Sequence, residues 1–518
     1  DKTLLEFQKF TNEELTITSE QKKIIDSEFK LNKKIFISGL QRSRILSEKA
    51  LKRTNQNKYR IAALNKQMSI YLQKTLTVFP NPANIWIMNG LIIRNQRAGI
   101  KSLAGFKNDE GDVIDVLSSA ASLSLGAHNP WLIYADRIED ALGIRDNIAA
   151  IYHPSLRQSF ALNKLAELHP NKNLIGKIKV HSESSGAIVN TIAIESSVCF
   201  AEKSNKKQSK MLAVDGSWSG GYGTAREATG FGIDAMQIKR SGNSSWVERV
   251  LPNPTKENEN NFLDIIKQRI RTKTLAGVIM EPDLLGDAGI LSNNPEVLIK
   301  MKDLLLKENL PIIFDCVQQI GRTGSYWGEF VNKYFSDYPQ LVLTTGKSAS
   351  NGLPFAFVLM PQDIADSSPP LTQLTTNQMN GPLLRAIVVS KILNDPRLQK
   401  WIKNKGFDIE RVSTENNLNI GQEGLRGKYL NRAVYVGSNE NVKLAQIALL
   451  IEDGILVGAL PESVRYQPNL VEFSITNSNV AQLIISRINK VLSGDISNVV
   501  KDIFEKMSGS SSGLAREN

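Results

Sequence analysis

One lysine stands out through the segment that carries it. Lys347 follows an apolar run that begins at Leu341, and small residues surround it as far as Pro354. A lysine amine attacks a carbonyl group only when it is unprotonated, and a sheltered place at the end of a strand favours that form. The small neighbours leave room for a flat molecule. The pattern therefore predicts a lysine that forms a Schiff base with a bound carbonyl compound.

The same segment also contains Gly346, Lys347 and Ser348, which is how a nucleotide-binding P-loop ends. A P-loop needs a second glycine five residues before the first of these residues. That position is Leu341, so the loop that would hold the phosphates is incomplete. We therefore reject a nucleoside triphosphatase.

A carboxylate ends the preceding apolar strand. Asp315 follows Ile312, Ile313 and Phe314, and burying its charge without a cationic partner would be costly. A protonated pyridine nitrogen is such a partner, and a cationic pyridine ring lets pyridoxal 5'-phosphate (PLP) accept electrons from a carbanion. The alternative is that Asp315 only caps the next segment through backbone N–H groups. The strand by itself leaves both interpretations open.

Taken together, these two segments resemble the motifs of class III (ornithine/ω-amino acid type) aminotransferases, which are PLP enzymes of fold type I. That family reads approximately S-K-x-x-x-N-G-x-P at its lysine and D-E-V-Q-x-G-x-G-R-T-G at its aspartate. Residues 346–354, which read G-K-S-A-S-N-G-L-P, and residues 315–324, which read D-C-V-Q-Q-I-G-R-T-G, resemble these patterns. The resemblance implies that Lys347 forms the Schiff base to PLP and acts as general base, and that Asp315 bonds the pyridine nitrogen. Val317 would pack on one ring face, and Gln318 would bond the phenolic oxygen.

Further segments match the family in its own order. The turn at 184–190 resembles the phosphate-binding N-S-G-[ST]-E-A-N motif, which implies that Ser185, Gly186 and Ala187 bind the cofactor phosphate. Trp218, in a segment that resembles F-H-G-R-T, would stack on the cofactor ring. Glu281 belongs to a match for the E-P motif and would organise polar groups near the pyridine side. The segments at 111–115 and 125–130 resemble two earlier family motifs.

Two more matches concern the substrate and a partner subunit. Arg465 lies in a segment that resembles V-[LI]-R-x-x-P-P-L, whose arginine receives the substrate carboxylate. Thr376, before Gly381 and Pro382, would reach the cofactor phosphate of the partner subunit, with one residue of uncertainty in register. The resemblance therefore implies a homodimer that binds an amine or amino acid and a keto acid. It implies no metal site.

Departures from the family pattern cluster around the cofactor. Ala187 replaces a hydroxyl residue, so phosphate binding there would depend on backbone N–H groups at a helix N-terminus. Ile188 replaces a glutamate, Ser219 a histidine, and Cys316 a glutamate. These changes put in doubt the usual substrate range and the second half-reaction with 2-oxoglutarate.

The pattern of segments predicts an α/β fold with a mostly parallel sheet covered by helices, of the seven-stranded type that the resemblance implies. We expect four regions: a basic helical N-terminal extension at 1–83, a PLP-binding large domain at 84–394 whose first part joins the small domain, a small C-terminal α/β domain at 395–508, and a disordered tail at 509–518. The predicted strands are Ile178 to Val180, Met211 to Val214, Gly277 to Met280, Ile312 to Phe314, Leu341 to Leu343, Arg432 to Val436 and Val471 to Ile475. Predicted helices include Asn261 to Ile270 and Pro295 to Lys307.

Composition and charge narrow the class of protein. The 518 residues are 41% hydrophobic and 22% charged, as in an ordinary globular protein, and no apolar stretch is long enough for a membrane span. With only Cys199 and Cys316, a disulfide framework is not expected, and we expect a cytoplasmic enzyme. Nearly all of the net charge of +11 comes from residues 31–75, where Glu48 is the single acid. We interpret this segment as a solvated helical face, with docking to an acidic partner, a membrane surface or nucleic acid as the alternative.

Three functions remain open at this point. The favoured one is transfer of an amino group from an amine or amino acid to a keto acid. The same fold and residues also serve PLP-dependent decarboxylases, racemases and aminomutases, because fold does not settle which bond is broken. A non-catalytic protein that kept the scaffold and binds a partner through its basic N-terminal segment is the third.

Overall fold

The structure of the chain is a computed structural model. It describes residues 18–52, 97–98, 105–108, 111–115, 122–126, 129–141, 156–205, 209–230, 246–286, 288–369, 382–460, 462–466, 470–498, 500–501 and 504–505. These residues belong to two compact units: unit 1 takes in those within 1–30 and 130–403, and unit 2 those within 31–129 and 404–518. The expected domain boundaries at 83, 394 and 508 stay predictions. Thr376, residues 53–75 of the basic segment and the predicted tail lie outside the described residues.

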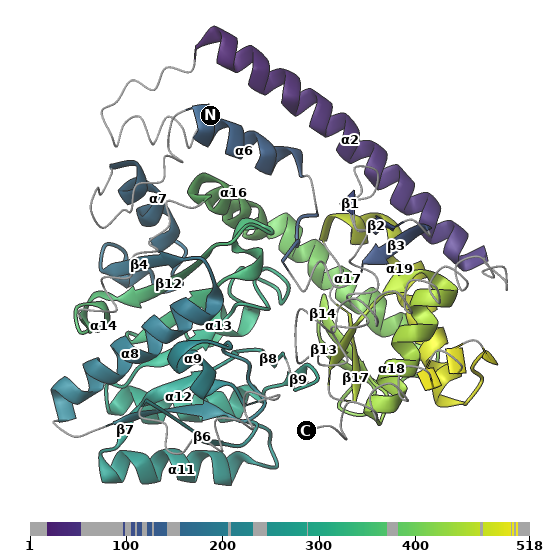
Figure 1. Cartoon of the computed structure of the whole chain (residues 1–518). Helices are drawn as coiled ribbons and strands as arrows, with labels where there is room; N and C mark the ends of the chain where they lie inside the picture. Colours follow the sequence, from purple (N-terminus) through teal and green to yellow (C-terminus); the bar gives the residue numbers. More distant parts are fainter. Residues whose placement is uncertain are drawn as a thin grey trace, which may run out of the picture. The chain divides into compact units, whose positions relative to one another are not determined.

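Unit 1 is built on one sheet, of which Figure 1 labels β4, β12, β7 and β6. The strand order of this sheet is β4-β12-β11-β10-β7-β5-β6. Its strands are β4 Ile178–Glu183, β5 Lys210–Val214, β6 Val247–Leu251, β7 Leu275–Met280, β10 Ile312–Asp315, β11 Leu341–Thr345 and β12 Ala356–Pro361. Only β12 runs antiparallel to its neighbours in this sheet; the other pairs are parallel. The prediction of an α/β fold with a mostly parallel seven-stranded sheet is confirmed.

The central strands are apolar along their whole length because both faces of the sheet are covered. Every residue of β7, β11 and β12 is buried. Helix α8, Gly186–Asn205, packs against β4, β7, β11 and β12, and helix α11, Glu259–Thr272, packs against β6 and β7. Strands covered in this way read as continuous apolar runs, which is why the five expected in this unit were recognisable in the sequence.

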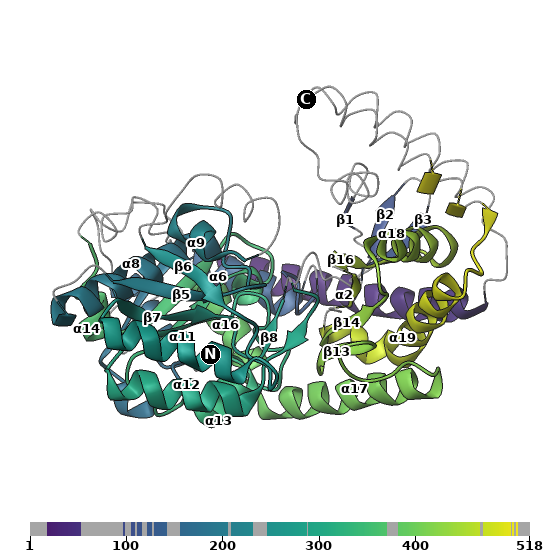
Figure 2. The same cartoon turned by 90° about the horizontal axis from the view of Figure 1, so that it is seen from below.

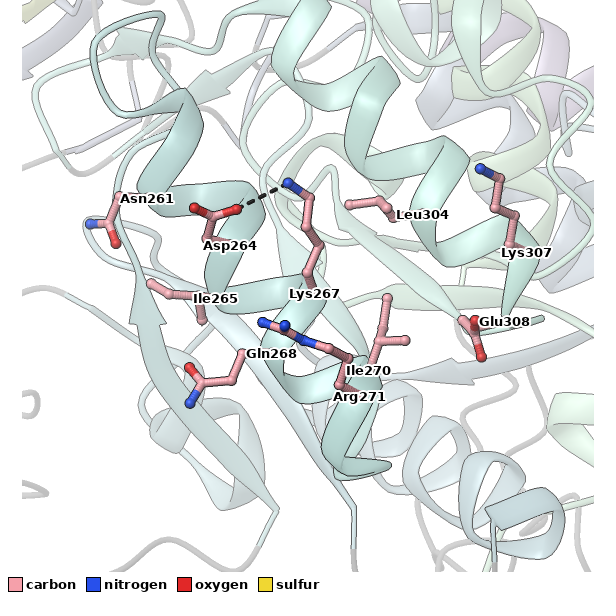
Figure 3. A pocket seen from close by; sticks show the side chains of 10 residues that line it. All are labelled: Asn261, Asp264, Ile265, Lys267, Gln268, Ile270, Arg271, Leu304, Lys307 and Glu308. Carbon is pink, nitrogen blue, oxygen red and sulfur yellow. Dashed lines mark hydrogen bonds and ion pairs between the residues drawn. The ribbon is translucent and has the colours of Figure 1, made fainter.

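The remaining helices of unit 1 are α6 Pro130–Ala141, α7 Leu156–Ala166, α9 Gly223–Ala228, α12 Pro295–Lys307, α13 Glu329–Tyr334, α14 Gln362–Ala365 and α16 Leu383–Leu393. Two 3-10 turns, η1 Lys172–Leu174 and η2 Lys347–Ser350, and the strand pair β8 Leu284–Leu285 and β9 Leu291–Ser292 complete the unit. Helices α11 and α12 lie side by side (Figure 2). A groove runs between them, and its lining side chains, which include Lys267, Arg271 and Lys307, contain none of the predicted site residues (Figure 3).

Unit 2 contains two small sheets. One has the order β1-β2-β3-β15, with β1 Arg97–Ala98, β2 Gly105–Asn108, β3 Gly111–Asp115 and β15 Ile455–Leu456. The other has the order β13-β14-β17-β16, with β13 Leu425–Lys428, β14 Asn431–Tyr435, β16 Gly458–Leu460 and β17 Ser463–Tyr466. The helical elements of this unit are α18 Asn439–Ala448, the π-helical turn η3 Leu449–Asp453 and α19 Leu470–Leu492. Helix α17, Pro396–Glu415, has residues in both units.

One predicted strand is wrong. Val471 to Ile475 was expected to be extended, but it forms the first turns of α19. A short apolar run fits a buried strand and a helix equally well. The longer helical pattern that follows, with Val480, Ile484 and Ile488 buried at intervals of four, continues backwards into it.

The first long helix, α2 Ser19–Lys52, confirms the helical prediction for the described part of the basic segment. Within unit 1 its early residues pack on α6: Glu28 accepts a hydrogen bond from Arg137 Nε at 2.6 Å, and the Phe29 ring packs edge-on against Tyr134. Among the described residues, no helix is both long enough and apolar enough to cross a membrane.

Candidate active site

The lysine turn begins where β11 ends. Gly346 is extended, with φ −175°, and Lys347 then enters the left-handed region at φ 36° and starts the 3-10 turn η2. Asn351 ends that turn, also left-handed, at φ 55°. A left-handed conformation costs a residue with a side chain about 1–2 kcal/mol, so the surrounding structure must hold this turn in place. The half-buried side chain of Lys347 therefore leaves a strand end, as the sequence predicts.

Asp315 lies at the matching end of the neighbouring strand. Strands β10 and β11 are parallel, and Asp315 is in register with Thr344. Parallel strands end at the same edge of a sheet, so this carboxylate and the lysine turn share that edge. Asp315 is 2% exposed; its Oδ1 accepts a hydrogen bond from the Val317 amide at 3.0 Å.

Asn190 is a site residue to which the sequence reasoning gave no role. From α8, its Nδ2 donates to Asp315 Oδ2 at 2.7 Å and to the Ser219 carbonyl at 2.7 Å. Its Oδ1 accepts from Thr344 Oγ1 at 2.5 Å. Both carboxylate oxygens of Asp315 therefore accept hydrogen bonds from N–H donors, which fix the orientation of the carboxylate. The signal in the sequence was its place as the last residue of the segment 184–190, where the resembled family motif also ends in asparagine.

The predicted phosphate turn, Ser185 to Ala187, joins β4 to the N-terminus of α8. Close packing at glycines brings the other motifs to it. A Cβ on Gly186 would lie 2.8 Å from Val317 Cγ2, and one on Gly346 would lie 3.2 Å from the Gly186 nitrogen. A Cβ on Gly220 would lie 2.5 Å from the Cβ of Ala187. The lysine, aspartate and tryptophan segments thus all contact the start of a long helix, whose N–H groups and dipole favour an anion.

Glu281 and Gln318 converge on a third glycine. Glu281 Oε2 accepts a hydrogen bond from the Gly286 amide at 2.8 Å. A Cβ on Gly286 would lie 2.7 Å from Glu281 Oε1 and 2.8 Å from Gln318 Oε1. Both side chains are nearly fully buried. The two polar groups that the sequence predicts beside a cofactor ring are therefore close neighbours.

The segment of Trp218 follows β5 and is fixed by Thr229. The amides of Ser219 and Gly220 donate to Thr229 Oγ1 at 3.2 and 3.1 Å, and that hydroxyl donates in turn to the Gly220 carbonyl at 2.7 Å. This hydroxyl network holds the loop that carries the half-buried ring of Trp218. It also explains why the Thr229 segment accompanies the aromatic residue in the sequence.

The electrostatics at this edge favour a cation. Burial, followed by the charges of Asp315, Asp283 and Glu281, raises the pKa of the Cys316 thiol well above its usual value. The thiol therefore stays neutral, and it donates to the Trp327 carbonyl at 3.8 Å. Cys316 occupies the place of a family glutamate, so the substitution removes one negative charge from a region that already holds three carboxylates.

The residues present fit pyridoxal phosphate. The start of α8 offers N–H groups to a phosphate, the buried carboxylate of Asp315 offers a counter-ion to a protonated pyridine nitrogen, and Lys347 offers an amine to an aldehyde. Glycines at 186, 220 and 346 let the three loops approach closely. The individual roles of these residues stay predictions.

Two of the predicted site residues are not among the unit 1 residues described above. Arg465 is on β17 of unit 2, 8% exposed, and pairs in register with Ala433 of β14. Thr376 falls outside the described residues.

A sheet with one reversed strand, a lysine after β11 and a helix N-terminus at the same edge define a PLP enzyme of fold type I. The family model for class III aminotransferases matches residues 102–492. This chain therefore belongs to the class III aminotransferases, and it is a PLP-dependent enzyme. The predictions of family, cofactor and transaminase activity are confirmed, and the non-catalytic alternative is not favoured.

Similar proteins agree with this assignment. The acetylornithine aminotransferase of Shewanella oneidensis is 25% identical over 362 residues, which are 64% of this chain and 84% of that protein. The acetylornithine aminotransferase of Clostridium acetobutylicum is 28% identical over 55% of this chain and 67% of that protein. An omega transaminase from Pseudomonas jessenii, solved in complex with PMP, shares the fold with a TM-score of 0.66 and 20% identity over 82% of this chain and 97% of that one.

Proposed function

We propose that this aminotransferase holds its cofactor covalently through Lys347 and that Asp315 is the counter-ion of the cofactor's ring nitrogen. The observation that carries the proposal is the common edge of β10 and β11, where Asp315 and the lysine turn lie beside the start of α8. When bound, PLP supplies an electron sink for a carbanion at the substrate carbon. Everything else in the reaction falls to the chain's own groups.

Each group has a distinct task. With PLP bound, Lys347 Nζ would take the proton from the donor's amine-bearing carbon as general base. Asp315 would keep a proton on the ring nitrogen, and Asn190 holds that carboxylate in place. Gln318 donates to the phenolic oxygen. Val317 covers one face of the ring.

We assign the cofactor phosphate to the turn at residues 185–187 and the second face of the cofactor ring to the loop that carries Trp218. The amides of Gly186 and Ala187, with the Ser185 hydroxyl, face the phosphate, since Ala187 brings no hydroxyl of its own. Trp218 would stack on the ring, and its loop is held by Thr229. Glu281, which accepts from Gly286, orients the polar groups on the pyridine side.

The substrate is proposed to be an amino acid whose carboxylate is bound by Arg465. The planar guanidinium matches a carboxylate in two-point contact. The curated relatives named above are acetylornithine aminotransferases, whose named substrate is an amino acid derivative. Replacing Arg465 with Ala is expected to raise KM for carboxylated donors about ten- to a hundredfold and to leave amines without a carboxylate unchanged.

The test of the covalent attachment is reduction by borohydride followed by peptide mapping. We expect the cofactor on a peptide containing Lys347 in the native chain and on no peptide of Lys347→Ala. Lys302→Ala is the matched control. The Lys302 amine donates to the Tyr334 carbonyl at 2.7 Å, and neither residue belongs to the lysine turn. A label on another lysine, or none in the native chain, overturns the assignment.

We also propose a homodimer in which Thr376 contacts the partner's cofactor phosphate. It is supported by the resemblance and by Ala187, which leaves the phosphate one hydroxyl short. A mixture of Lys347→Ala and Thr376→Ala chains should regain activity, since one site of each mixed dimer has both residues. A fully active monomer in sedimentation contradicts it.

We propose a cytoplasmic location from the two cysteines, and an acidic partner from the positive charge of residues 31–75. Cys199 and Cys316 are both free, as expected of a chain in the cytoplasm. An acidic partner for residues 31–75 is proposed from their charge alone. Cell fractionation tests the cytoplasmic location. The acidic partner is tested by comparing how strongly the native chain and a chain with Lys33 and Lys34 changed to Glu bind an acidic polymer.

A further inference from the structure

The lysine turn is held at its far end by an arginine from another element. Arg385 lies in the first turn of α16. Its Nε donates to the Ser350 carbonyl at 2.6 Å, and a terminal nitrogen donates to the Asn351 carbonyl at 3.1 Å. Ser350 is the last residue of η2 and Asn351 is its C-cap, so both carbonyls lie at the C-terminal end of the lysine turn. A cation at this end also opposes their partial negative charge.

A carboxylate fixes the arginine in turn. The other terminal nitrogen of Arg385 donates to Asp136 Oδ2 on α6 at 2.6 Å. The side chains of the two residues are only 11% and 17% exposed, so water screens this ion pair weakly. The planar guanidinium makes all three contacts at once, which an ammonium group on a flexible stem could not do with the same geometry.

The turn needs such support. Lys347 and Asn351 both have left-handed backbone conformations, at φ 36° and 55°, which persist only where surrounding contacts hold them. Helix α16 packs directly on η2 and on α6. A change at Arg385 therefore reaches the backbone of Lys347 within one turn of chain.

We propose that Arg385, fixed by Asp136, is a positioning residue that sets where the Lys347 amine points. The inference rests on the proposed role of Lys347. Arg385 contacts the backbone of the turn and is not assigned any contact with substrate or cofactor. Its effect follows from geometry, since a displacement of about 1 Å in a reacting group can lower a rate about a hundredfold.

The experiment compares Arg385→Lys, Arg385→Ala and Asp136→Asn with a matched control. Arg487→Ala removes an arginine of similar burial, 20% exposed, which bonds Asp453 at 2.8 and 2.9 Å in unit 2. For the three test variants we expect kcat to fall about ten- to a hundredfold, with bound cofactor retained. Arg385→Lys keeps the charge but not the fork, so it is expected to lose activity as well.

Two readouts separate positioning from plain stability. The first is the pH midpoint of the bound cofactor's absorbance change, which should shift in the test variants and stay in place in Arg487→Ala. The second is the acetylation rate of Lys347 in cofactor-free protein, measured by peptide mass spectrometry, which should change at least severalfold. Melting temperature is recorded for all variants, so that Asp136→Asn and Arg385→Lys serve if Arg385→Ala does not fold.

The outcomes are distinct. If the test variants lower the melting temperature as Arg487→Ala does, while kcat, the absorbance midpoint and Lys347 acetylation stay unchanged, Arg385 has only a structural role and the inference is overturned. If borohydride labels a lysine other than Lys347, the proposed function fails whatever the Arg385 variants do.

Discussion

At the scale of single residues, Gly286 is a position where a substitution should disturb the site without disturbing the fold. A methyl group at 286 would meet the side-chain ends of Glu281 and Gln318 at 2.7 and 2.8 Å, and both ends can move aside. Gly286→Ala should therefore change the melting temperature little but displace Gln318 from the cofactor. We expect at least a tenfold weaker PLP affinity or lower kcat, measured by absorbance titration and steady-state kinetics.

A second glycine provides the control. A Cβ on Gly406 would lie 2.5 Å from the Cα of Tyr429, which is backbone and cannot move aside cheaply. Gly406→Ala should lower the melting temperature and leave the activity of the folded fraction unchanged. Native PLP affinity and kcat in Gly286→Ala would refute the crowding of Gln318.

The same scale separates what the sequence could predict about the site from what it could not. Lys347 and Asp315 were predicted as site residues because each follows an apolar strand, which is a local pattern. No role was predicted for Asn190, because its partners are Ser219, Asp315 and Thr344, which are 29, 125 and 154 residues away along the chain. A buried amide gains its role only from such distant partners.

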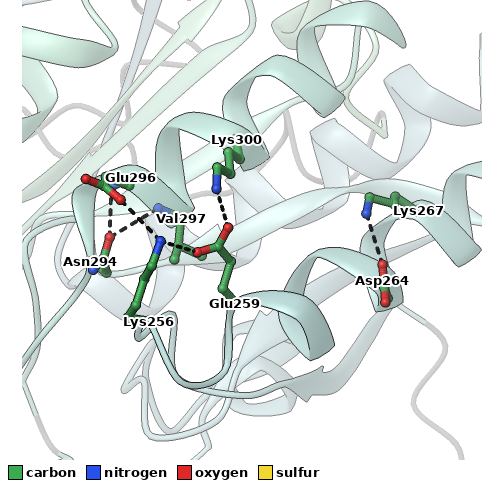
Figure 4. Close-up of polar contacts among 8 residues, drawn as sticks. All are labelled: Lys256, Glu259, Asp264, Lys267, Asn294, Glu296, Val297 and Lys300. Atoms are coloured by element: carbon green, nitrogen blue, oxygen red, sulfur yellow. Dashed lines mark hydrogen bonds and ion pairs between the residues drawn. The ribbon is translucent and has the colours of Figure 1, made fainter.

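At the scale of elements, the start of α12 offers a test of two kinds of stabilisation. Asn294 Oδ1 caps the helix by accepting from the Glu296 and Val297 amides at 2.9 and 3.3 Å (Figure 4). Asn294→Ala should lower the free energy of unfolding by about 1 kcal/mol. Denaturant titration measures this loss, which should be the same at low and high salt because no full charge is removed.

The neighbouring ion pairs should behave differently. Glu259 of α11 accepts from Lys256 at 2.8 Å and from Lys300 of α12, and these hydrogen bonds lower its pKa to about 2 (Figure 4). Because the two lysines are exposed, Glu259→Gln should cost less than the cap, and its cost should fade in 1 M salt, where screening acts within about 3 Å. A salt-independent loss in Glu259→Gln would contradict this assignment.

Helix α12 was predicted correctly from the sequence, whereas residues 471–475 were not. The helix expected at Pro295 to Lys307 is α12 itself, because an asparagine cap, a proline in the first turn and a regular apolar face coincide there. Val471 to Ile475 had no such boundary signals. Its alternation is too short to decide between strand and helix, and the packing of the rest of α19 decided it.

At the scale of the whole molecule, acid stability should depend on one buried histidine. His169 is fully buried; its Nε2 donates to the Leu341 carbonyl at 3.2 Å, and its Nδ1 accepts from the Asn171 amide at 3.2 Å. Burial is the main reason that its pKa falls from 6.5 to about 4. The folded protein therefore keeps His169 neutral at pH values where the unfolded chain already binds the proton.

Because the pKa of His169 is lower in the folded protein than in the unfolded chain, acid favours unfolding. Stability from His169 is complete above pH 6.5 and is lost as the pH falls towards 4, by about 3 kcal/mol in all. Denaturant titrations between pH 7 and 4.5 should show a smaller loss for His169→Gln than for the native chain. Parallel curves for the two proteins would show that another group governs acid unfolding.

The global arrangement was predictable only in part. Alternating apolar strands and helices indicated the sheet, but the strand order and the partner of each strand depend on contacts that no local pattern encodes. In unit 2, for example, Ile114 of β3 pairs with Ile455 of β15.

The place of β4 at the edge of the sheet bears on how the protein is made. In the described part of the chain, β4 pairs only with β12, so β4 has no strand partner until residues 356–361 have been synthesised. At about 5 to 20 residues per second, the delay is on the order of ten to thirty seconds. During that interval β4, which leads into the predicted phosphate turn, is an edge strand without its partner and exposes unpaired backbone N–H and C=O groups on both sides.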